Sequence, residues 1–334
     1  MFPREAYKKL RLRLAYKKRR LPTFIWGPPG IGKSAIVYQV AEDLGYEVRT
    51  LIASTCDPVD LRGCLKIDED RKFSSWVPPR FFDVPEGKKV VFFFDELNTA
   101  TPSVQAAFYR IILEGKLDNI DISQYTRIGA GNRQVDLAAV NRMPTPLVSR
   151  FLHMELEPSL DDWKEWAYKA GVKDVVISFL NFRRDLLHQM PKDRDTPFPT
   201  PRTYEFLSDL IDCQGEDITC EDIGGVVGKG VASEFLAFLA VFNELPKTPQ
   251  EILTKGVAFK GKPDRQYAVN GILTNFFRTK PTKDTAEDIL RYSYKIEEEF
   301  AVCLVKDCIL INKAIMASNS EFRHWTSKFQ NIIL

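Results

Sequence analysis

The sequence has 334 residues, which exceeds the usual size of one domain and predicts two or three. Hydrophobic residues make up 44% of the chain and charged residues 28%, a composition typical of a folded protein with a sizeable core. With a formal net charge of +2, the whole chain has no strong field that would attract nucleic acid or a membrane. The apolar run 235–242 is too short to cross a bilayer, and no signal peptide opens the chain, so we expect a cytoplasmic protein.

The first twenty residues form a basic segment, in which nine residues are lysine or arginine and only Glu5 is acidic. We expect a basic N-terminal helix over residues 1–20. It is either a solvated helix at the edge of a domain, whose long side chains cover apolar surface, or a contact for nucleic acid or an acidic partner. Because a charge run alone is weak evidence, we favour the solvated helix.

Residues 21–157 alternate between short strand-like runs and helical patterns. Strand-like runs lie at 23–26, 48–53, 90–94, 127–130 and 151–156, and helical patterns at 34–44 and 101–115. The run 90–94 is apolar without alternation, as in a central parallel strand that is covered on both faces. This order predicts an α/β fold with a doubly wound parallel sheet and helices on both of its faces.

The pattern becomes mostly helical after Pro158. Thr200 and Pro201 are typical of a helix start, and Thr219 with Asp222 resembles a capping pair. We therefore expect a helical lid over residues 158–245 and a helical C-terminal extension over residues 246–334.

A glycine-rich loop follows the first strand and precedes the first periodic helix, in the pattern GxxxxGK[ST] at residues 27–34. Glycines let backbone N–H groups approach phosphates, and the helix N-terminus attracts an anion. Lys33 would reach the β- and γ-phosphates of ATP, and Ser34 would bind Mg²⁺ through its hydroxyl. The residues that we expect to hold the nucleotide are Gly27, Pro28, Pro29, Gly30, Ile31, Gly32, Lys33, Ser34 and Ala35.

Two acidic residues, Asp95 and Glu96, come directly after the apolar run 90–94. Ligands of such sheets bind at the carboxyl ends of the strands. Asp95 would hold Mg²⁺, and Glu96 would orient and polarise the attacking water, because phosphoryl transfer depends on positioning and charge neutralisation. The alternative is a solvated acidic turn, which the preceding P-loop disfavours.

These residues resemble the AAA+ ATPases, and within them the MoxR-like group. The P-loop fits, and residues 95–100 are similar to that group's Asp-Glu-Ile-Asn-Arg-Ala sequence, although Thr99 replaces the arginine. Residues 56–63 resemble the family's segment that leads into an insert in its second helix. The resemblance covers about residues 20–225.

The resemblance implies further roles at the nucleotide site. Asn132 matches the first sensor, which contacts the attacking water or the γ-phosphate, and its amide can both donate and accept. Arg150 matches the arginine finger that reaches a neighbouring subunit's nucleotide, with Arg142 as a second candidate. Arg202 matches the second sensor, at the start of a helix in the lid. A turn asparagine and surface arginines are the structural alternatives.

The resemblance also implies partners. Members of the group form rings, usually hexameric, that remodel or activate a protein client as chaperones do, often a protein with a von Willebrand A domain. Residues 61–80 and 117–125 would be loops that face this partner or a central pore. Two alternatives stay open: a nucleic-acid motor or loader that uses the basic N-terminus, and a scaffold that binds ATP and scarcely hydrolyses it.

Overall fold

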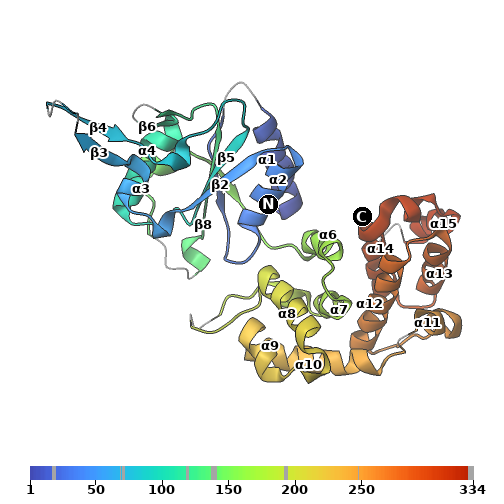
Figure 1. The fold of residues 1–334 in the computed structure, drawn as a ribbon. Helices are drawn as coiled ribbons and strands as arrows, with labels where there is room; N and C mark the ends of the chain where they lie inside the picture. Colours follow the sequence, from blue (N-terminus) through green and yellow to red (C-terminus); the bar gives the residue numbers. More distant parts are fainter. Residues whose placement is uncertain are drawn as a thin grey trace. The chain divides into compact units, whose positions relative to one another are not determined.

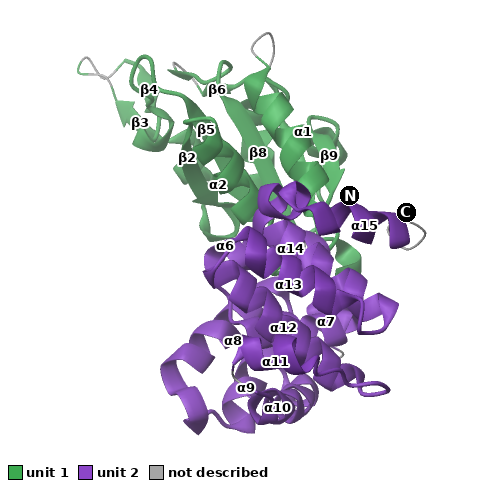
Figure 2. Cartoon of the chain, turned by 90° about the vertical axis from the view of Figure 1, so that its right-hand side faces the viewer, with its two compact units in different colours: residues 1–158 green, residues 159–334 purple. Residues whose placement is uncertain are grey.

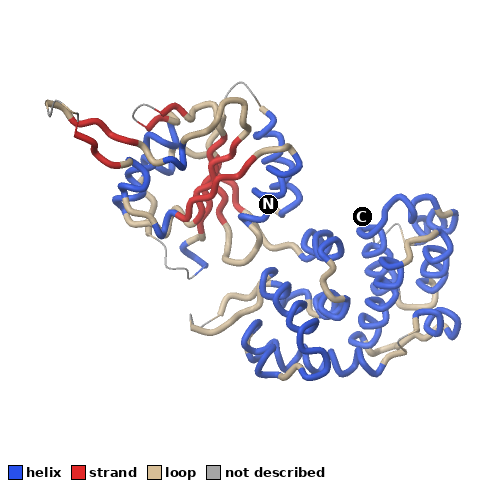
Figure 3. Tube along the Cα trace, viewed as in Figure 1, coloured by secondary structure: helices blue, strands red, loops and turns tan. Residues whose placement is uncertain are grey.

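The computed structural model of the protein describes residues 1–16, 20–67, 69, 72–117, 120–136, 141–191, 195–246 and 248–329 (Figure 1). The chain divides into two compact units, Met1–Pro158 and Ser159–Leu334 (Figure 2). The first is built around a sheet, and the second contains helices (Figure 3). In the described part of the chain, no helix is long and apolar enough to cross a membrane.

Unit 1 has a five-stranded parallel sheet in the order β2-β5-β8-β1-β9. The strands are β1 (Thr23–Trp26), β2 (Glu47–Ile52), β5 (Val90–Asp95), β8 (Thr126–Gly131) and β9 (Leu152–Glu155). The central strand β5 is fully buried from Val90 to Phe94, since Phe92 and Phe94 pack on one face and Val91 and Phe93 on the other. The α/β fold predicted from the apolar runs is confirmed.

Helices cover both faces of this sheet (Figure 1). The helices α1 (Pro3–Ala15) and α2 (Lys33–Asp43) share one core, and α3 (Pro58–Arg62), α4 (Pro102–Leu113) and α5 (Thr145–Val148) share the other. The expected basic helix is α1, which ends before Lys17, Lys18 and Arg19; these three lie outside the described residues. Its Ala6, Leu10 and Leu14 are buried, and Lys8 and Arg11 are exposed.

Two antiparallel hairpins extend unit 1. The expected loop 61–80 contains a two-stranded ribbon, β3 (Cys64–Ile67) and β4 (Ser74–Val77), which projects from the body of the unit in Figure 1. The expected hairpin near residues 117–125 is formed by β6 (Lys116–Leu117) and β7 (Ile120–Asp121). Arg127 of β8 connects the segments on both sides of this hairpin. Its buried guanidinium donates hydrogen bonds to the carbonyls of Ile112 before the hairpin and of Ile122 and Tyr125 after it. This burial lowers the pKa of Arg127 to about 10.

The described part of unit 2 is helical. The helices are α6 (Leu160–Ala170), α7 (Asp174–Phe182), α8 (Pro201–Gln214), α9 (Cys220–Val227), α10 (Lys229–Glu244), α11 (Pro249–Lys255), α12 (Pro263–Thr279), α13 (Lys283–Ser293), α14 (Glu298–Ser318) and α15 (Ser320–Lys328). Short 3₁₀ turns span Ala53–Thr55, Arg80–Phe82, Gln134–Asp136, Arg184–Leu187 and Gly215–Asp217. Thr200 caps α8 through the N–H of Thr203, and Thr219 forms a capping box with Asp222, as their sequence patterns indicate.

One hydrophobic core runs through all of unit 2, from α6 to α15. A buried ion pair crosses it, because the Lys164 Nζ of α6 lies 2.6 Å from the Asp307 Oδ1 of α14. Tyr168 and Asn181 donate to the other carboxylate oxygen, Asp307 Oδ2, at 2.9 and 2.8 Å. The helices after residue 246 therefore share both an apolar core and a polar network with those before it.

Candidate nucleotide site

The phosphate loop connects β1 to α2 and is packed tightly at its start. A Cβ built on Gly27 would lie 2.6 Å from the Ile31 Cδ1 and 2.9 Å from the Leu156 carbonyl oxygen, so only glycine fits there. Gly30 and Gly32 have φ angles of 75° and 92°, which favour glycine. Gly32 is the N-cap of α2, and the first N–H groups of a helix have no partner within the helix itself. The loop can therefore present N–H groups to an anion.

Lys33 is held across this loop. Its ammonium donates to the carbonyls of Gly27 and Pro28 at 2.8 and 2.9 Å, and to the Asn132 Oδ1 at 2.7 Å. Asn132 follows β8, which is the neighbour of β1 in the sheet. Parallel pairing thus places two side chains that are 99 residues apart in the sequence within hydrogen-bond distance at the carboxyl edge of the sheet.

Ser34 and Asp95 form a second contact at the same edge. The Ser34 hydroxyl donates to the Asp95 Oδ2 at 2.6 Å. One hydroxyl and one carboxylate are the protein oxygens that a nucleotide-bound Mg²⁺ needs, because this ion keeps several waters and uses phosphate oxygens as well. These donors therefore fit Mg²⁺, and among the described residues no group of three His, Cys, Asp or Glu side chains is placed to hold another kind of metal ion.

Glu96 has an unusual backbone conformation. Its φ of 54° is the only positive value at a non-glycine residue in the described chain, and its N–H donates to the Asp95 Oδ1 at 2.9 Å. The exposed carboxylate accepts a hydrogen bond from the hydroxyl of Ser54, which follows β2. Residues other than glycine with such backbone angles cluster at active sites and at ligand-binding sites. Sequence reasoning missed Ser54, whose only signal is its position after the strand next to β5.

Asn98 joins three loops behind this edge. Its side-chain amide donates to the Asn132 carbonyl at 2.7 Å, and its backbone carbonyl accepts from the N–H of Asn141 at 2.8 Å. The carboxamide of Asn141 then reaches the carbonyl oxygens of Thr99 and Ala100. The sequence resemblance includes Asn98 in a motif but assigns it no role. In the structure, Asn98 is placed to position the backbone of Asn132 and of Asn141.

The two candidate finger residues differ in their surroundings. The Arg150 guanidinium lies 5.3 Å from the ring centre of Tyr109 on α4 and donates to the Pro146 carbonyl, while its Nε is buried without a partner. Arg142 is exposed and lines a cleft of about 440 Å³ together with Trp26 and other residues. Both arginines flank α5.

The structure brings Lys33, Ser34, Asp95 and Asn132 into direct contact, with Glu96 next to Asp95. Arg202 is not part of this set, because it belongs to unit 2, where it is exposed in the first turn of α8.

Comparison with known proteins agrees with this geometry. Residues 22–151 match the family model of the AAA domain of the dynein-related subfamily. Unit 1 is an AAA+ ATPase domain. Two curated relatives are the Holliday junction branch migration complex subunits RuvB of Treponema pallidum and Treponema denticola, which are 28% and 27% identical over 141 residues. The match covers 38% of this chain and about a third of each relative, 33% and 34%.

Solved structures of Thermotoga maritima RuvB are also similar. A mutant of that protein aligns with a TM-score of 0.43 at 20% identity, over 76% of each chain. The Thermotoga maritima RuvB Holliday junction branch migration motor aligns with a TM-score of 0.42 at 19% identity, over 75% of this chain and 74% of its own. Since these TM-scores are below 0.5, the assignment to the AAA+ class depends on the AAA domain match.

Proposed function

We propose that this protein is a MoxR-like AAA+ ATPase that forms a ring, usually a hexamer in that group, and remodels or activates a protein partner. The observation that carries the ATPase part is the convergence of Lys33 with Asn132, at 2.7 Å, and of Ser34 with Asp95, at 2.6 Å. Residues from the loop after β1, from β5 and from the end of β8 thus meet at the edge where ATP would bind.

In this proposal each residue of the site has one task. The N–H groups of residues 27–35 and the ammonium of Lys33 bind the phosphates of ATP, and Ser34 with Asp95 holds Mg²⁺. The metal ion would neutralise charge on the phosphate oxygens. Glu96 orients and polarises the water once its carboxylate leaves Ser54, and Asn132 holds that water or the γ-phosphate in place.

Ring formation is proposed because the contacts found at Lys33, Ser34, Asp95 and Asn132 involve no arginine, and phosphoryl transfer gains from an arginine that stabilises charge in the transition state. Arg150 would supply this charge from a neighbouring subunit, with Arg142 as the second candidate, and Arg202 would bind the γ-phosphate from the lid. An arginine supplied in trans typically contributes a factor of about 10³ to 10⁵ in rate.

A protein partner is supported by the exposed ribbon β3–β4. Its side chains Leu65, Ile67, Trp76 and Val77 are apolar and between 39% and 67% exposed. Leu65 is directly opposite Trp76 in the antiparallel register, so both lie on the same face of the ribbon. Exposed apolar side chains on a projecting ribbon suit a protein surface, such as that of a von Willebrand A domain, better than a phosphate backbone.

The experiment that tests this function uses Glu96→Gln as a trap. The variant keeps the ATP site but loses hydrolysis, so it should retain its partner when purified with ATP. We expect protein to be recovered and no nucleic acid, and we expect less protein when Leu65 and Trp76 are both replaced by serine. Recovery of nucleic acid alone would reject the protein partner, and equal hydrolysis by wild type and Glu96→Gln would reject the catalytic assignment.

A second candidate is an ATP-driven motor or loader on nucleic acid. It is favoured by the exposed Lys8 and Arg11 of α1 and by the similarity to RuvB, a subunit of the Holliday junction branch migration complex. This function requires that DNA or RNA stimulate hydrolysis and that the stimulation fall steeply with salt. Replacing Lys8 and Arg11 by glutamine should then remove the stimulation and leave the basal rate unchanged.

A further inference from the structure

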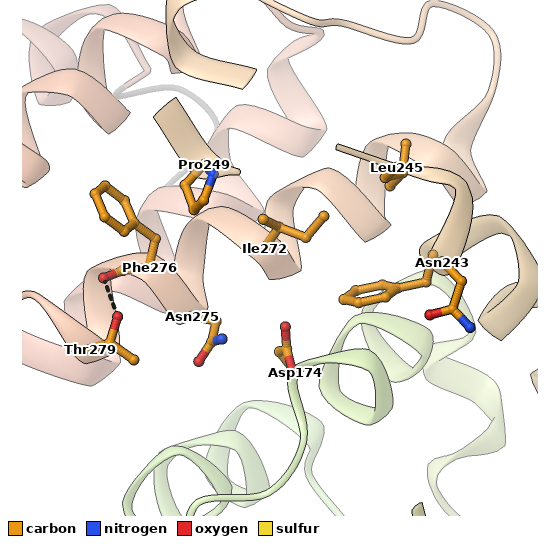
Figure 4. Close-up of a pocket in the computed structure, with 9 residues that line it drawn as sticks. Asp174, Asn243, Leu245, Pro249, Ile272, Asn275, Phe276 and Thr279 are labelled. Atoms are coloured by element: carbon orange, nitrogen blue, oxygen red, sulfur yellow. Dashed lines mark hydrogen bonds between the residues drawn. The ribbon is translucent and has the colours of Figure 1, made fainter. Parts of the chain in front are cut away.

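A second, smaller cavity lies in unit 2, and its lining includes none of the residues assigned above. It is enclosed by the start of α7, the end of α10, the start of α11 and the last turns of α12 (Figure 4). Its volume is about 250 Å³. Pockets for drug-sized ligands or cofactors usually measure about 300 to 1,000 Å³, so this cavity suits a single side chain rather than a nucleotide.

Asp174 is the one charged residue among the described residues that line the cavity. Figure 4 shows its carboxylate directed toward Ile272, between Asn275 and Asn243. Burial raises the pKa of Asp174, although backbone hydrogen bonds at Asp174 and Val175 and the charges of Arg278 and Lys173 act in the opposite direction. The carboxylate therefore carries a desolvation cost that a cation in the cavity would offset.

The two neighbouring cations are engaged elsewhere. Arg278 donates to the Val172 carbonyl at 3.3 Å and to the Asn275 Oδ1 at 2.8 Å. Lys173 pairs with Asp212. In the described structure neither forms an ion pair with Asp174, so its carboxylate is available to a ligand from outside.

The walls of the cavity favour one kind of cation. Phe242 and Phe276 offer aromatic surface, and Leu245, Pro249 and Ile272 offer aliphatic surface. An arginine side chain stacks on aromatic rings, buries its methylene groups against aliphatic ones and donates two parallel hydrogen bonds to a carboxylate. The C-terminal ends of α10 and α12 and the N-terminal starts of α7 and α11 bring helix dipoles of opposite sign to the cavity, so its preference for a cation comes from Asp174.

We infer that this cavity binds an arginine side chain of a partner protein, which inserts between Phe242 and Phe276 and pairs with the carboxylate of Asp174. The inference is independent of the ATPase and of its ring, because unit 2 alone supplies every residue that it requires.

The test is a titration of the full chain with Nα-acetyl-arginine methylamide, observed through the methyl resonance of Ile272 in NMR spectra of methyl-labelled protein. We expect a saturable shift of this resonance. The matched probe is the citrulline analogue, which has nearly the same shape without charge and should bind at least tenfold more weakly. Asp174→Asn should reduce the affinity for the arginine probe to that of the citrulline probe.

A second variant keeps the test valid if Asp174→Asn does not fold. Thr279 is exposed at the rim of the cavity, so Thr279→Arg should fold normally and occupy Asp174 from within the chain. It should abolish binding of the arginine probe. Equal affinity for the two probes, or full binding by Thr279→Arg, would overturn the inference. If probe binding is lost as the protein concentration rises, a second copy of this chain occupies the cavity. That result would overturn the inference that a different protein supplies the arginine.

Discussion

At the scale of single residues, the hydroxyl of Ser54 determines where the carboxylate of Glu96 points. The hydrogen bond between them joins Glu96 to the segment that follows β2, and the φ of 54° at Glu96 is uncommon for a residue with a side chain. A carboxylate that must polarise a water has to leave this hydroxyl first. The contact therefore limits the basal rate of hydrolysis that we propose.

Ser54→Ala tests this limit. Removing the hydroxyl frees the Glu96 carboxylate without changing the phosphate loop, so we expect kcat for ATP to rise several-fold while KM stays the same. Steady-state hydrolysis by the purified protein measures both, and Ser54→Thr, which keeps a hydroxyl, serves as the control. A kcat that falls in Ser54→Ala would show that the contact supports catalysis instead.

Tyr109 is expected to position Arg150. The ring holds the guanidinium through a cation–π contact at 5.3 Å, an interaction of about 0.5 to 2 kcal/mol. Tyr109→Phe keeps this contact and should hydrolyse ATP at the wild-type rate. Tyr109→Leu should lower kcat about tenfold without changing KM.

Mixing experiments distinguish the two candidate arginine fingers. Arg150→Ala or Arg142→Ala protein is mixed with Lys33→Ala protein, and ATP hydrolysis by the mixture is measured. Arg150→Ala should regain activity in such a mixture, because each subunit then supplies what the other lacks. If mixing with Lys33→Ala protein restores hydrolysis to Arg142→Ala and not to Arg150→Ala, Arg142 is the residue that acts in trans.

Asp174 gives unit 2 a dependence on pH. Its pKa is higher in the folded than in the unfolded chain, so the folded state binds more protons in the interval between the two values. The free energy of unfolding should therefore decrease as the pH rises from about 4, the ordinary value of an aspartate, through the folded pKa. Hydrogen exchange of the α7 and α12 amides should show this decrease in wild type and not in Asp174→Asn.

At the scale of elements, strand β8 depends on two glycines. A Cβ on Gly129 would lie 2.8 Å from the Phe24 ring, and a Cβ on Gly131 would lie 2.1 Å from the Asn98 Oδ1. The glycines let Phe24 and Asn98 pack closely against β8, which ends one residue before Asn132. Side chains at these positions would move the very residue that contacts Lys33.

Gly131→Ala should therefore damage the site as well as the fold. Overpacking of this kind costs about 1 to 3 kcal/mol of stability, and displacement of Asn98 should weaken its hydrogen bond to the Asn132 carbonyl. Thermal unfolding and ATP hydrolysis measure the two effects. Gly225→Ala is a matched control for glycine replacement, because its φ is not positive and its Cβ would meet no atom within 4 Å. A lower melting temperature with normal hydrolysis in Gly131→Ala would show that the Asn98 hydrogen bond does not support the site.

The elements that sequence reasoning predicted are those whose signals are local. Apolar runs, a glycine loop and helix-capping threonines each lie within a few residues, and the sheet follows from their order. The contact between Ser54 and Glu96 requires the pairing of β2 with β5, and the ion pair of Lys164 with Asp307 joins residues 143 apart. No local pattern encodes such pairs, so neither was predictable, and the roles of Asn132, Arg150 and Arg202 stay predictions.

At the scale of the whole molecule, the Lys164–Asp307 pair makes the helices on both sides of residue 246 one folding unit. Breaking a buried pair from one side leaves an uncompensated charge and typically costs about 3 to 5 kcal/mol. Asp307→Leu should therefore destabilise unit 2 strongly, whereas Lys164→Met combined with Asp307→Leu should recover most of the loss. Urea unfolding followed by the fluorescence of tryptophans measures both variants, and equal losses in the single and double variants would contradict this account.

The contacts of Asn98 also have a consequence for how the subunits of the proposed ring would influence one another. Asn98 links the turn after Glu96 to the end of β8 through its side-chain amide and to the segment that leads to Arg142 through its backbone carbonyl, so we expect these three loops to move together. In the proposed ring, a change at one subunit's γ-phosphate would thus be passed to the face that it presents to its neighbour. ATP hydrolysis in one subunit would then be coupled to its neighbour through the side chain and the backbone carbonyl of Asn98.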